Sequence, residues 1–148
     1  MQEIDYLILK ILCRNNKPTR LKKIHEEIKN QKGLETPFST INSSIERLEK
    51  LDYVEWTRYY PIKLTEKGLN LAKELIRHAQ LLELFLYNEL KLSRDDAHYE
   101  SEKLNLLLSC ETINKICEKY CHPTICPCGE EILNSKHCYC LDEPKKFR

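Results

Sequence analysis

The chain has 148 residues and a formal net charge of only +1, with 24 Lys and Arg against 23 Asp and Glu. Its hydrophobic content of 41% supports a modest core, whereas its most apolar stretch, residues 81–87, is too short to span a bilayer. The first residues do not resemble a signal peptide. These features argue against a membrane-spanning or low-complexity chain and predict a cytoplasmic globular protein with no membrane partner.

Basic residues are concentrated in the N-terminal half. Residues 1–63 carry 12 Lys and Arg against 9 Asp and Glu, whereas residues 64–148 carry 12 against 14. Residues 14–23 include several basic side chains and no acid. Such a run suits contact with a phosphate backbone, although a solvated helix face explains it equally well.

The first 64 residues predict three helices followed by a β-hairpin. Apolar residues recur at helical spacing over residues 2–15, Thr19 is expected to cap a second helix over residues 20–31, and Thr36-Pro37 is expected to begin a third. Residues 53–57 and 62–64 read as two strands joined by a turn. This order predicts a winged helix-turn-helix.

The predicted third helix exposes short polar side chains near its start, which can approach base edges closely, although any solvated helix carries such residues. Basic and aromatic residues of the second helix and the hairpin suit phosphates or the minor groove. The predicted DNA-binding residues are Arg20, Lys22, Lys23, Ser39, Thr40, Asn42, Ser43, Arg47, Arg58, Tyr59 and Lys63.

A long apolar helix is predicted over residues 65–90. It is apolar over so much of its circumference that it must be covered on several sides, which favours a second subunit. Ser93 and Ser109 are expected to cap two further helices. The fold class is therefore mainly α with a small β-hairpin. We expect a winged helix-turn-helix domain (1–66), a helical dimerisation and metal-sensing domain (67–120) and an irregular cysteine-rich tail (121–148).

Six of the eight cysteines lie in the last 32 residues. In a reducing cytosol this clustering favours metal ligation over disulfides. The favoured set of thiolates is Cys117, Cys121, Cys126 and Cys128, with Cys110, Cys138 and Cys140 as further possible ligands. The two Cys-x-Cys units differ from the paired knuckles of structural zinc sites, so we favour an iron–sulfur cluster of the 4Fe-4S type, with Zn²⁺ as the alternative.

Four segments together resemble a known family of regulators. They are residues 47–54, the Leu-Thr-Glu-Lys-Gly motif at 64–68, the apolar run at 81–86 and Leu-Leu-Ser at 107–109. Over residues 5–130 the chain resembles the iron- and manganese-dependent repressors of the diphtheria toxin repressor class, in the short form without an SH3-like domain. This resemblance implies a non-enzymatic transcriptional regulator that binds a palindromic DNA operator as a homodimer.

The resemblance also implies a divalent metal site for Fe²⁺ or Mn²⁺, in a weakened form. The residues that match ligand positions of this class are Asp5, Glu83, His98 and Glu102. The chain departs from the class at Ala79, where relatives carry a histidine, and at Asn105-Leu106, where they carry a Glu-His pair. Cys128 lies where relatives often have a histidine, so sulfur replaces nitrogen there.

We expect the bound cofactor to order the tail and thereby set the separation of two recognition helices. Two alternatives remain open at this point. The tail is a structural zinc staple on a winged-helix protein that senses nothing, or the protein is a redox carrier whose winged helix is only a scaffold.

Overall fold

In the computed structural model, residues 1–135 are described. The described residues form two compact units, one over residues 1–72 and one that begins at residue 73. The described residues contain six helices and one two-stranded antiparallel sheet, which confirms a mainly α fold with a small β-hairpin. None of the described helices is long and apolar enough to cross a membrane.

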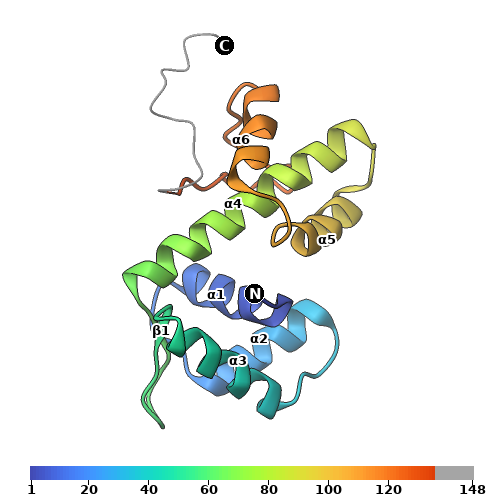
Figure 1. Ribbon diagram of the computed structural model, residues 1–148. Coiled ribbons are helices and arrows are strands. Elements are labelled where there is room, and N and C mark those ends of the chain that lie inside the picture. The colour runs from blue at the N-terminus through green and yellow to red at the C-terminus, as the bar shows by residue number, and fades with distance from the viewer. Residues whose placement is uncertain (136–148) are drawn as a thin grey trace. The chain divides into compact units, whose positions relative to one another are not determined.

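The first unit is a winged helix (Figure 1). It consists of α1 (Glu3–Asn15), α2 (Leu21–Lys32), α3 (Phe38–Lys50), β1 (Val54–Glu55) and β2 (Lys63–Leu64). Helix α1 packs against α2, α3 and β2, and α3 packs against β1. The three helices meet through fully buried aliphatic side chains, among them Ile8, Leu9, Ile24, Ile28, Ile41 and Ile45.

Two predicted helix starts are wrong by one residue. Thr19 does not cap α2, because its N–H and C=O both pair with Ile62, at 2.8–2.9 Å, and its hydroxyl donates to the Lys17 carbonyl. Arg20 is the N-cap instead. Pro37 occupies the N-cap of α3 rather than its first helical position, with an extended ψ of 143°. In each case the backbone places the start of the helix one residue later.

The junction between the hairpin and α4 (Glu66–Glu89) depends on close backbone approach. The Thr65 hydroxyl accepts a hydrogen bond from Gly68 N at 2.9 Å and donates one to the Asp52 carbonyl. A Cβ at Gly68 would lie 1.9 Å from the Tyr53 carbonyl oxygen. Only glycine fits at this point, which explains the glycine that ends the motif at residues 64–68.

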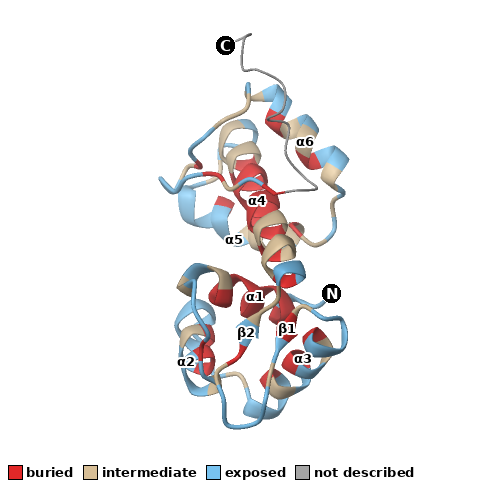
Figure 2. Ribbon diagram, turned by 90° about the vertical axis from the view of Figure 1, so that its left-hand side faces the viewer, coloured by how far each residue is buried: buried red, intermediate tan, exposed pale blue. Residues whose placement is uncertain are grey.

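The second unit is built on the C-terminal part of α4, with α5 (Arg94–Leu104) and α6 (Cys110–Lys119). As predicted, Ser93 and Ser109 cap the last two helices, because their hydroxyls accept hydrogen bonds from Asp96 N and Thr112 N. Helix α4 is buried around most of its circumference between residues 75 and 83, including polar residues (Figure 2). The prediction that this helix is covered on several sides is confirmed.

Residues 122–135 provide part of that cover. Gln80 on α4 donates to the Glu131 carbonyl and accepts from Leu133 N, both at 2.9 Å, so one side chain pairs with this strand-like segment twice. Cys126 and Ile132 enter an apolar cluster with residues of α4 and α6. Up to Ser135 the predicted irregular tail therefore contributes Cys126 and Ile132 to the core of the second unit. The rest of the predicted tail, including Cys138 and Cys140, lies outside the described residues.

Candidate functional site

Three metal-ligating side chains from separate segments converge in the second unit. Glu83 comes from α4, His98 from α5 and Cys128 from the turn after α6, and one ligand atom of each lies within 4.8 Å of the others. Glu83 is only 1% exposed, and its Oε1 lies 3.3 Å from His98 Nδ1. These three residues are called the Glu83 centre below.

Local structure holds two of these side chains in place. Glu102 follows His98 by one turn of α5, and its carboxylate lies 3.8 Å from His98 Nε2, so the imidazole lies between two carboxylates. Cys128 lies in a tight turn in which Gly129 N donates to the Cys126 carbonyl at 2.9 Å. Gly129 has φ of +90°, which favours glycine. The turn thus presents the Cys128 thiol toward α4 and α5.

The two cysteines of this turn differ in environment. Cys126 is buried, and burial together with a hydrogen bond to the Cys128 thiol raises its pKa to about 12. Cys126 is consequently a neutral thiol at ordinary pH, whereas Cys128 is exposed. Their sulfur atoms are 2.7 Å apart and share one hydrogen bond. Cys128 is therefore the thiol of this pair that is accessible to a ligand.

The charge and the burial of the Glu83 carboxylate suit the binding of a cation. Burial raises the pKa of Glu83, but His98 and the thiols of Cys126 and Cys128 lower it by more. The net shift is downward, so Glu83 is ionised at neutral pH. Its Oε1 atom has no hydrogen-bond partner of good geometry. An ionised oxygen left unsatisfied in a buried site is costly, and a divalent cation would satisfy it. A carboxylate, an imidazole and a thiolate together suit Zn²⁺ and similar divalent transition metals.

The favoured set of four thiolates does not converge in the described structure. Cys121 lies past the end of α6 in a left-handed conformation, with φ of 61°, and is exposed. Cys121 therefore lies outside the helix that carries Cys117. Cys117 is buried, with its sulfur 3.4 Å from His122 Nδ1. Among residues 1–135, neither group of three metal-ligating residues contains more than one cysteine.

Asp5, the predicted ligand position nearest the N-terminus, is engaged by protein groups in this structure. It is buried in the first unit, where its carboxylate accepts hydrogen bonds from the Ser44 hydroxyl, from Arg47 at 2.8 Å and from Gln2 N at 2.9 Å. Burial raises its pKa, but these three donors outweigh burial and lower it overall. Protein groups thus satisfy the Asp5 carboxylate in this structure, and its role as a metal ligand stays a prediction.

The same contacts change the interpretation of Arg47. Its guanidinium pairs with Asp5 and reaches Gln2 Oε1 at 3.2 Å, so it is half-buried and occupied within the winged helix. Asn42 is also only partly exposed. The other predicted DNA-binding residues are exposed, namely Arg20, Lys22, Lys23, Ser39, Thr40, Ser43, Arg58, Tyr59 and Lys63.

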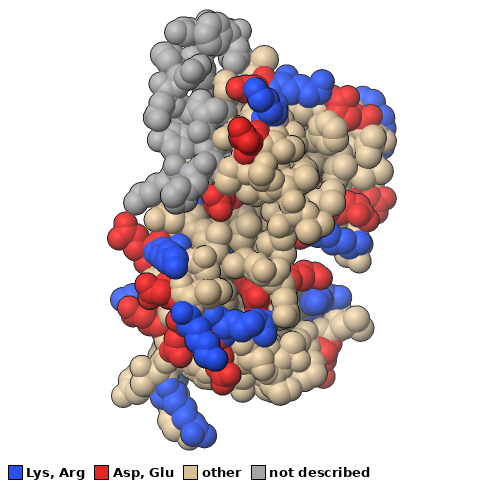
Figure 3. All heavy atoms as spheres, viewed as in Figure 1, with Lys and Arg blue, Asp and Glu red and all other residues tan. Residues whose placement is uncertain are grey.

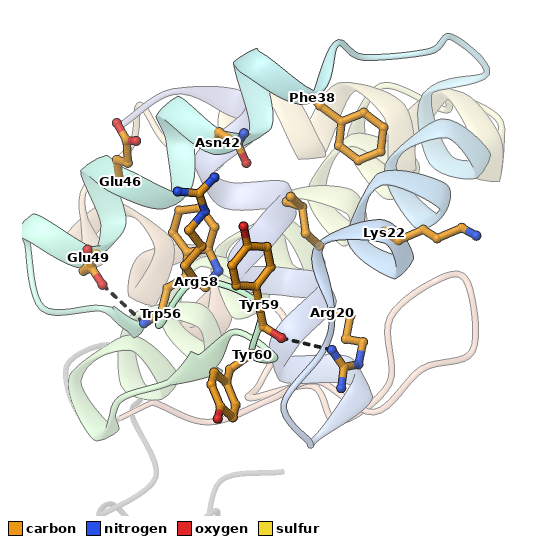
Figure 4. A pocket seen from close by; sticks show the side chains of 11 residues that line it. Arg20, Lys22, Phe38, Asn42, Glu46, Glu49, Trp56, Arg58, Tyr59 and Tyr60 are labelled. Atoms are coloured by element: carbon orange, nitrogen blue, oxygen red, sulfur yellow. Dashed lines mark hydrogen bonds between the residues drawn. The ribbon is translucent and has the colours of Figure 1, made fainter.

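A groove of about 980 Å³ lies between α2, α3 and the β1–β2 connection (Figure 4). Arg58 points toward α3 within it, and Arg20 holds the connection through a hydrogen bond of 3.2 Å to the Tyr59 carbonyl. Glu46 and Trp56, which were not among the predicted DNA-binding residues, also line the groove. Glu46 lies one turn beyond Asn42, so helical spacing was the signal that placed it on this face.

Lys and Arg side chains on the visible face of the winged helix are interspersed with Asp and Glu (Figure 3). The groove itself combines both signs, with Arg20, Lys22 and Arg58 against Glu46 and Glu49. A groove of this composition can contact phosphates through its cations, while a carboxylate on α3 can accept a hydrogen bond from a base edge.

Comparisons with known proteins agree with this arrangement. Residues 65–134 match the sequence model of a family described as "iron dependent repressor, metal binding and dimerisation domain". The chain is 30% identical over 114 residues to MJ0568 of Methanocaldococcus jannaschii, named an uncharacterized HTH-type transcriptional regulator, covering 76% of this chain and 86% of that protein.

Two solved structures share the fold at similar identity. The manganese regulator SloR superposes with a TM-score of 0.74 at 26% identity, over 93% of this chain and 61% of that one. A manganese-dependent transcriptional repressor solved with manganese gives a TM-score of 0.75 at 27% identity, over 92% of this chain and 60% of that one. The chain thus spans about three fifths of these two regulators. Neither description mentions iron–sulfur chemistry, so the predicted cluster gains no support from them.

Proposed function

The chain belongs to the family of iron-dependent repressors, and from this premise we propose that it is a metal-responsive, DNA-binding transcriptional regulator. The observation that carries the proposal is the convergence of Glu83, His98 and Cys128 in the unit that follows a winged helix. A redox carrier would not need the exposed polar face of α3 or the basic β1–β2 connection. A purely structural zinc site usually contains two to four cysteine ligands, whereas the Glu83 centre contains one.

The winged helix supplies the contacts with double-stranded DNA. We assign base contacts to Ser39, Thr40, Asn42 and Ser43 at the start of α3, and phosphate contacts to the cations of α2 and the β1–β2 connection. The protein acts as a homodimer, because a palindromic operator presents two half-sites about 34 Å apart, one for each recognition helix. Arg47 acts within the protein, through Asp5, rather than on DNA.

The Glu83 centre is the proposed sensing site, with Glu102 beside His98 as a further ligand. Bound there, a divalent cation supplies positive charge and joins three segments. Glu83 contributes the buried anionic oxygen, His98 the imidazole nitrogen and Cys128 the thiolate. The thiolate favours Fe²⁺ or Zn²⁺ over Mn²⁺, because sulfur ligands prefer softer ions.

The chain's own residues explain how occupancy of this centre is transmitted. Cys128 belongs to residues 122–135, a segment that is hydrogen-bonded to Gln80 of α4. His98 and Glu102 belong to α5. Ligation therefore stabilises the packed form of α4, α5 and residues 122–135 relative to looser forms. A form stabilised by a ligand gains population according to ligand concentration and affinity. We propose that this form binds the operator more tightly.

The test measures DNA affinity of the full chain with and without metal. A duplex is selected from a random pool with the anaerobic Fe²⁺-loaded protein, and its affinity is measured by fluorescence anisotropy with Fe²⁺, with Zn²⁺ and after chelation. We expect metal to raise affinity by about tenfold or more, the usual range of a coupling free energy. Iron and sulfide analysis of the same protein separates a mononuclear ion from the alternative 4Fe-4S cluster.

Glu83→Gln tests the site within this experiment. The variant keeps the shape of the side chain and removes the anionic ligand, so we expect the metal effect on DNA affinity to be largely lost. Glu100→Gln on α5 is the matched control and should respond like the wild type, because Glu100 is half-exposed and pairs with Lys103 of the same helix. Equal DNA affinities of metal-loaded and chelated wild-type protein would contradict the sensing role.

A second variant tests the DNA-binding surface. Arg58→Ala should weaken binding and reduce the slope of log affinity against log salt by about 0.9, the share of one phosphate contact. Arg94→Ala, an exposed cation at the start of α5 in the second unit, is the control and should leave the slope unchanged. An unchanged slope for Arg58→Ala would remove Arg58 from the interface.

A further inference from the structure

A second group of three metal-ligating side chains lies elsewhere in the second unit. It consists of Glu74 and His78, one turn apart on α4, and Cys110, the first residue of α6. One ligand atom of each lies within 4.8 Å of the other two. The group shares no residue with the Glu83 centre, and His78 and Glu83 are about 140° apart around α4 because five residues separate them.

The donor atoms of this group already face one another. The Cys110 thiol donates a hydrogen bond to Glu74 Oε1 at 3.1 Å, and the Cys110 sulfur lies 3.5 Å from His78 Nε2. In a tetrahedral site each ligand atom lies about 2.0–2.3 Å from the metal, so two ligand atoms lie about 3.3–3.8 Å from each other, close to the separations seen here. Small side-chain rotations would therefore be enough to surround an ion.

The imidazole of His78 is held in the form that binds metals. Its Nδ1 lies 3.2 Å from the Asn105 carbonyl, which accepts a hydrogen bond only if Nδ1 carries the proton. The lone pair of a neutral ring is then on Nε2, the atom that faces Cys110. Burial lowers the pKa of His78, which favours this neutral ring. Ligating histidines usually have such a carbonyl partner on their other nitrogen.

Asn105 is itself fixed. It is 1% exposed, and its side-chain amide donates to the Leu75 carbonyl on α4 at 3.1 Å. The residue that positions His78 is thus anchored to the helix that carries both His78 and Glu74. An orienting partner with a defined place of its own distinguishes a prepared site from a chance cluster of polar side chains.

We propose that Glu74, His78 and Cys110 form a second metal site, selective for Zn²⁺ and related ions, which joins α4 to the start of α6. A carboxylate, an imidazole and a thiolate match the ligands that Zn²⁺ prefers, whereas Mg²⁺ and Ca²⁺ require oxygen ligands. Three protein ligands leave the fourth tetrahedral position for water or a small ligand. Glu74 and Cys110 are both partly exposed, so an ion can reach the site from solvent.

Binding involves one proton and no redox change. The Cys110 thiol loses its proton to solvent as sulfur binds the ion, and its hydrogen bond to Glu74 is replaced by bonds from both groups to the metal. His78 is already neutral and releases none. Metal affinity at this site should consequently increase as pH rises, as expected when a ligand must be deprotonated. The site is independent of the proposed function, because an ion can bind here whether or not the protein binds DNA.

The experiment uses the full chain carrying Cys128→Ser, which removes the thiolate of the Glu83 centre. Co²⁺ is titrated anaerobically and followed by sulfur-to-cobalt charge-transfer absorbance, and Zn²⁺ affinity is measured by competition with a chromophoric chelator. We expect a charge-transfer band in this protein. Adding Cys110→Ser should remove the band and weaken Zn²⁺ binding by more than about tenfold, since loss of even an orienting partner of a ligand costs that much.

Cys13→Ser in the same background is the matched control and should keep both the band and the affinity, because Cys13 lies on α1 in the first unit. Glu74→Gln and His78→Gln provide ligand variants should Cys110→Ser fold poorly, as judged by circular dichroism, and each should weaken Zn²⁺ binding. An unchanged band and Zn²⁺ affinity in the Cys110→Ser protein, or no band in the Cys128→Ser protein, would overturn the proposal. Neither result bears on metal-dependent DNA binding, which the Glu83→Gln experiment tests separately.

Discussion

The first unit buries the carboxylate of Asp5 on α1, and the second buries that of Glu83 on α4. The partners of these two carboxylates differ. Asp5 in the first unit is 4% exposed and is paired with a guanidinium, a hydroxyl and a backbone N–H. Glu83 in the second unit is 1% exposed and faces an imidazole and a thiol. The pKa of both groups is lowered. Burial and a shifted pKa therefore do not identify a metal site; the chemistry of the neighbouring groups does.

The largest expected effect concerns the stability of the first unit. Gly68→Ala would place a methyl group 1.9 Å from the Tyr53 carbonyl oxygen, in a backbone contact that cannot relax cheaply. We expect the free energy of unfolding to fall by about 3 kcal/mol or more, at the upper end of overpacking effects. Chemical denaturation followed by circular dichroism measures it.

Gly33→Ala is the control for that substitution. Gly33 has φ of +70°, but nothing lies within 4 Å of a Cβ there. Its cost should be limited to the backbone strain of a left-handed alanine, about 1 kcal/mol. A loss at Gly33 as large as that at Gly68 would show that conformational freedom, and not close approach to Tyr53, explains the glycine of the 64–68 motif.

The next effect separates the two buried carboxylates directly. A ligand at 100 times its dissociation constant stabilises a folded protein by about 2.7 kcal/mol. Fe²⁺ should therefore raise the thermal unfolding midpoint of wild-type protein and of Asp5→Asn by similar amounts, and that of Glu83→Gln by less. Differential scanning calorimetry under anaerobic conditions measures the shifts. A smaller Fe²⁺-induced shift of the unfolding midpoint in Asp5→Asn than in the wild type would indicate that Asp5 is a metal ligand.

A smaller effect is expected from the ion pair of the first unit. Arg47→Ala leaves the Asp5 carboxylate buried with fewer donors and should cost about 2 kcal/mol, less than a fully buried pair because Arg47 is partly solvated. The folded pKa of Asp5 is lowered, so the stability it contributes is present above its unfolded pKa, about 3.9, and is lost as pH falls through the lower folded value. The difference between wild type and variant should therefore shrink below about pH 4.

The smallest effect concerns the surface of the second unit. The Tyr120 hydroxyl donates to Glu89 at 2.7 Å, and burial together with this bond raises the pKa of Tyr120 to about 12. The stability linked to this group is present below its unfolded pKa, about 10, and is lost as pH rises toward the folded value. Glu89→Gln should lower the pKa of Tyr120 in an ultraviolet titration. An unchanged pKa would assign the shift to burial alone.

Local features of the fold followed from the sequence. Apolar spacing and capping residues together predicted the six helices of residues 1–135. The caps at Ser93 and Ser109 were confirmed because an N-cap hydrogen bond joins residues two or three apart. The helix starts near Thr19 and Pro37 were misplaced because contacts with a distant segment and a backbone torsion decided them. The division into domains at residues 66 and 120 stays a prediction.

The sequence by itself determined the order of helices, the hairpin and the kinds of ligand available, because periodicity, capping and composition depend on near neighbours in the chain. Only the tertiary structure decided which ligands meet. In the structure Cys121 lies outside the helix that carries Cys117, and Asp5 pairs with Arg47. Two groups of ligands converge, namely Glu83 with His98 and Cys128, and Glu74 with His78 and Cys110. These sets span 36 to 45 residues of sequence from their first to their last member. Spacing does not encode them, because how α4, α5, α6 and the following turn pack determines which side chains face one another.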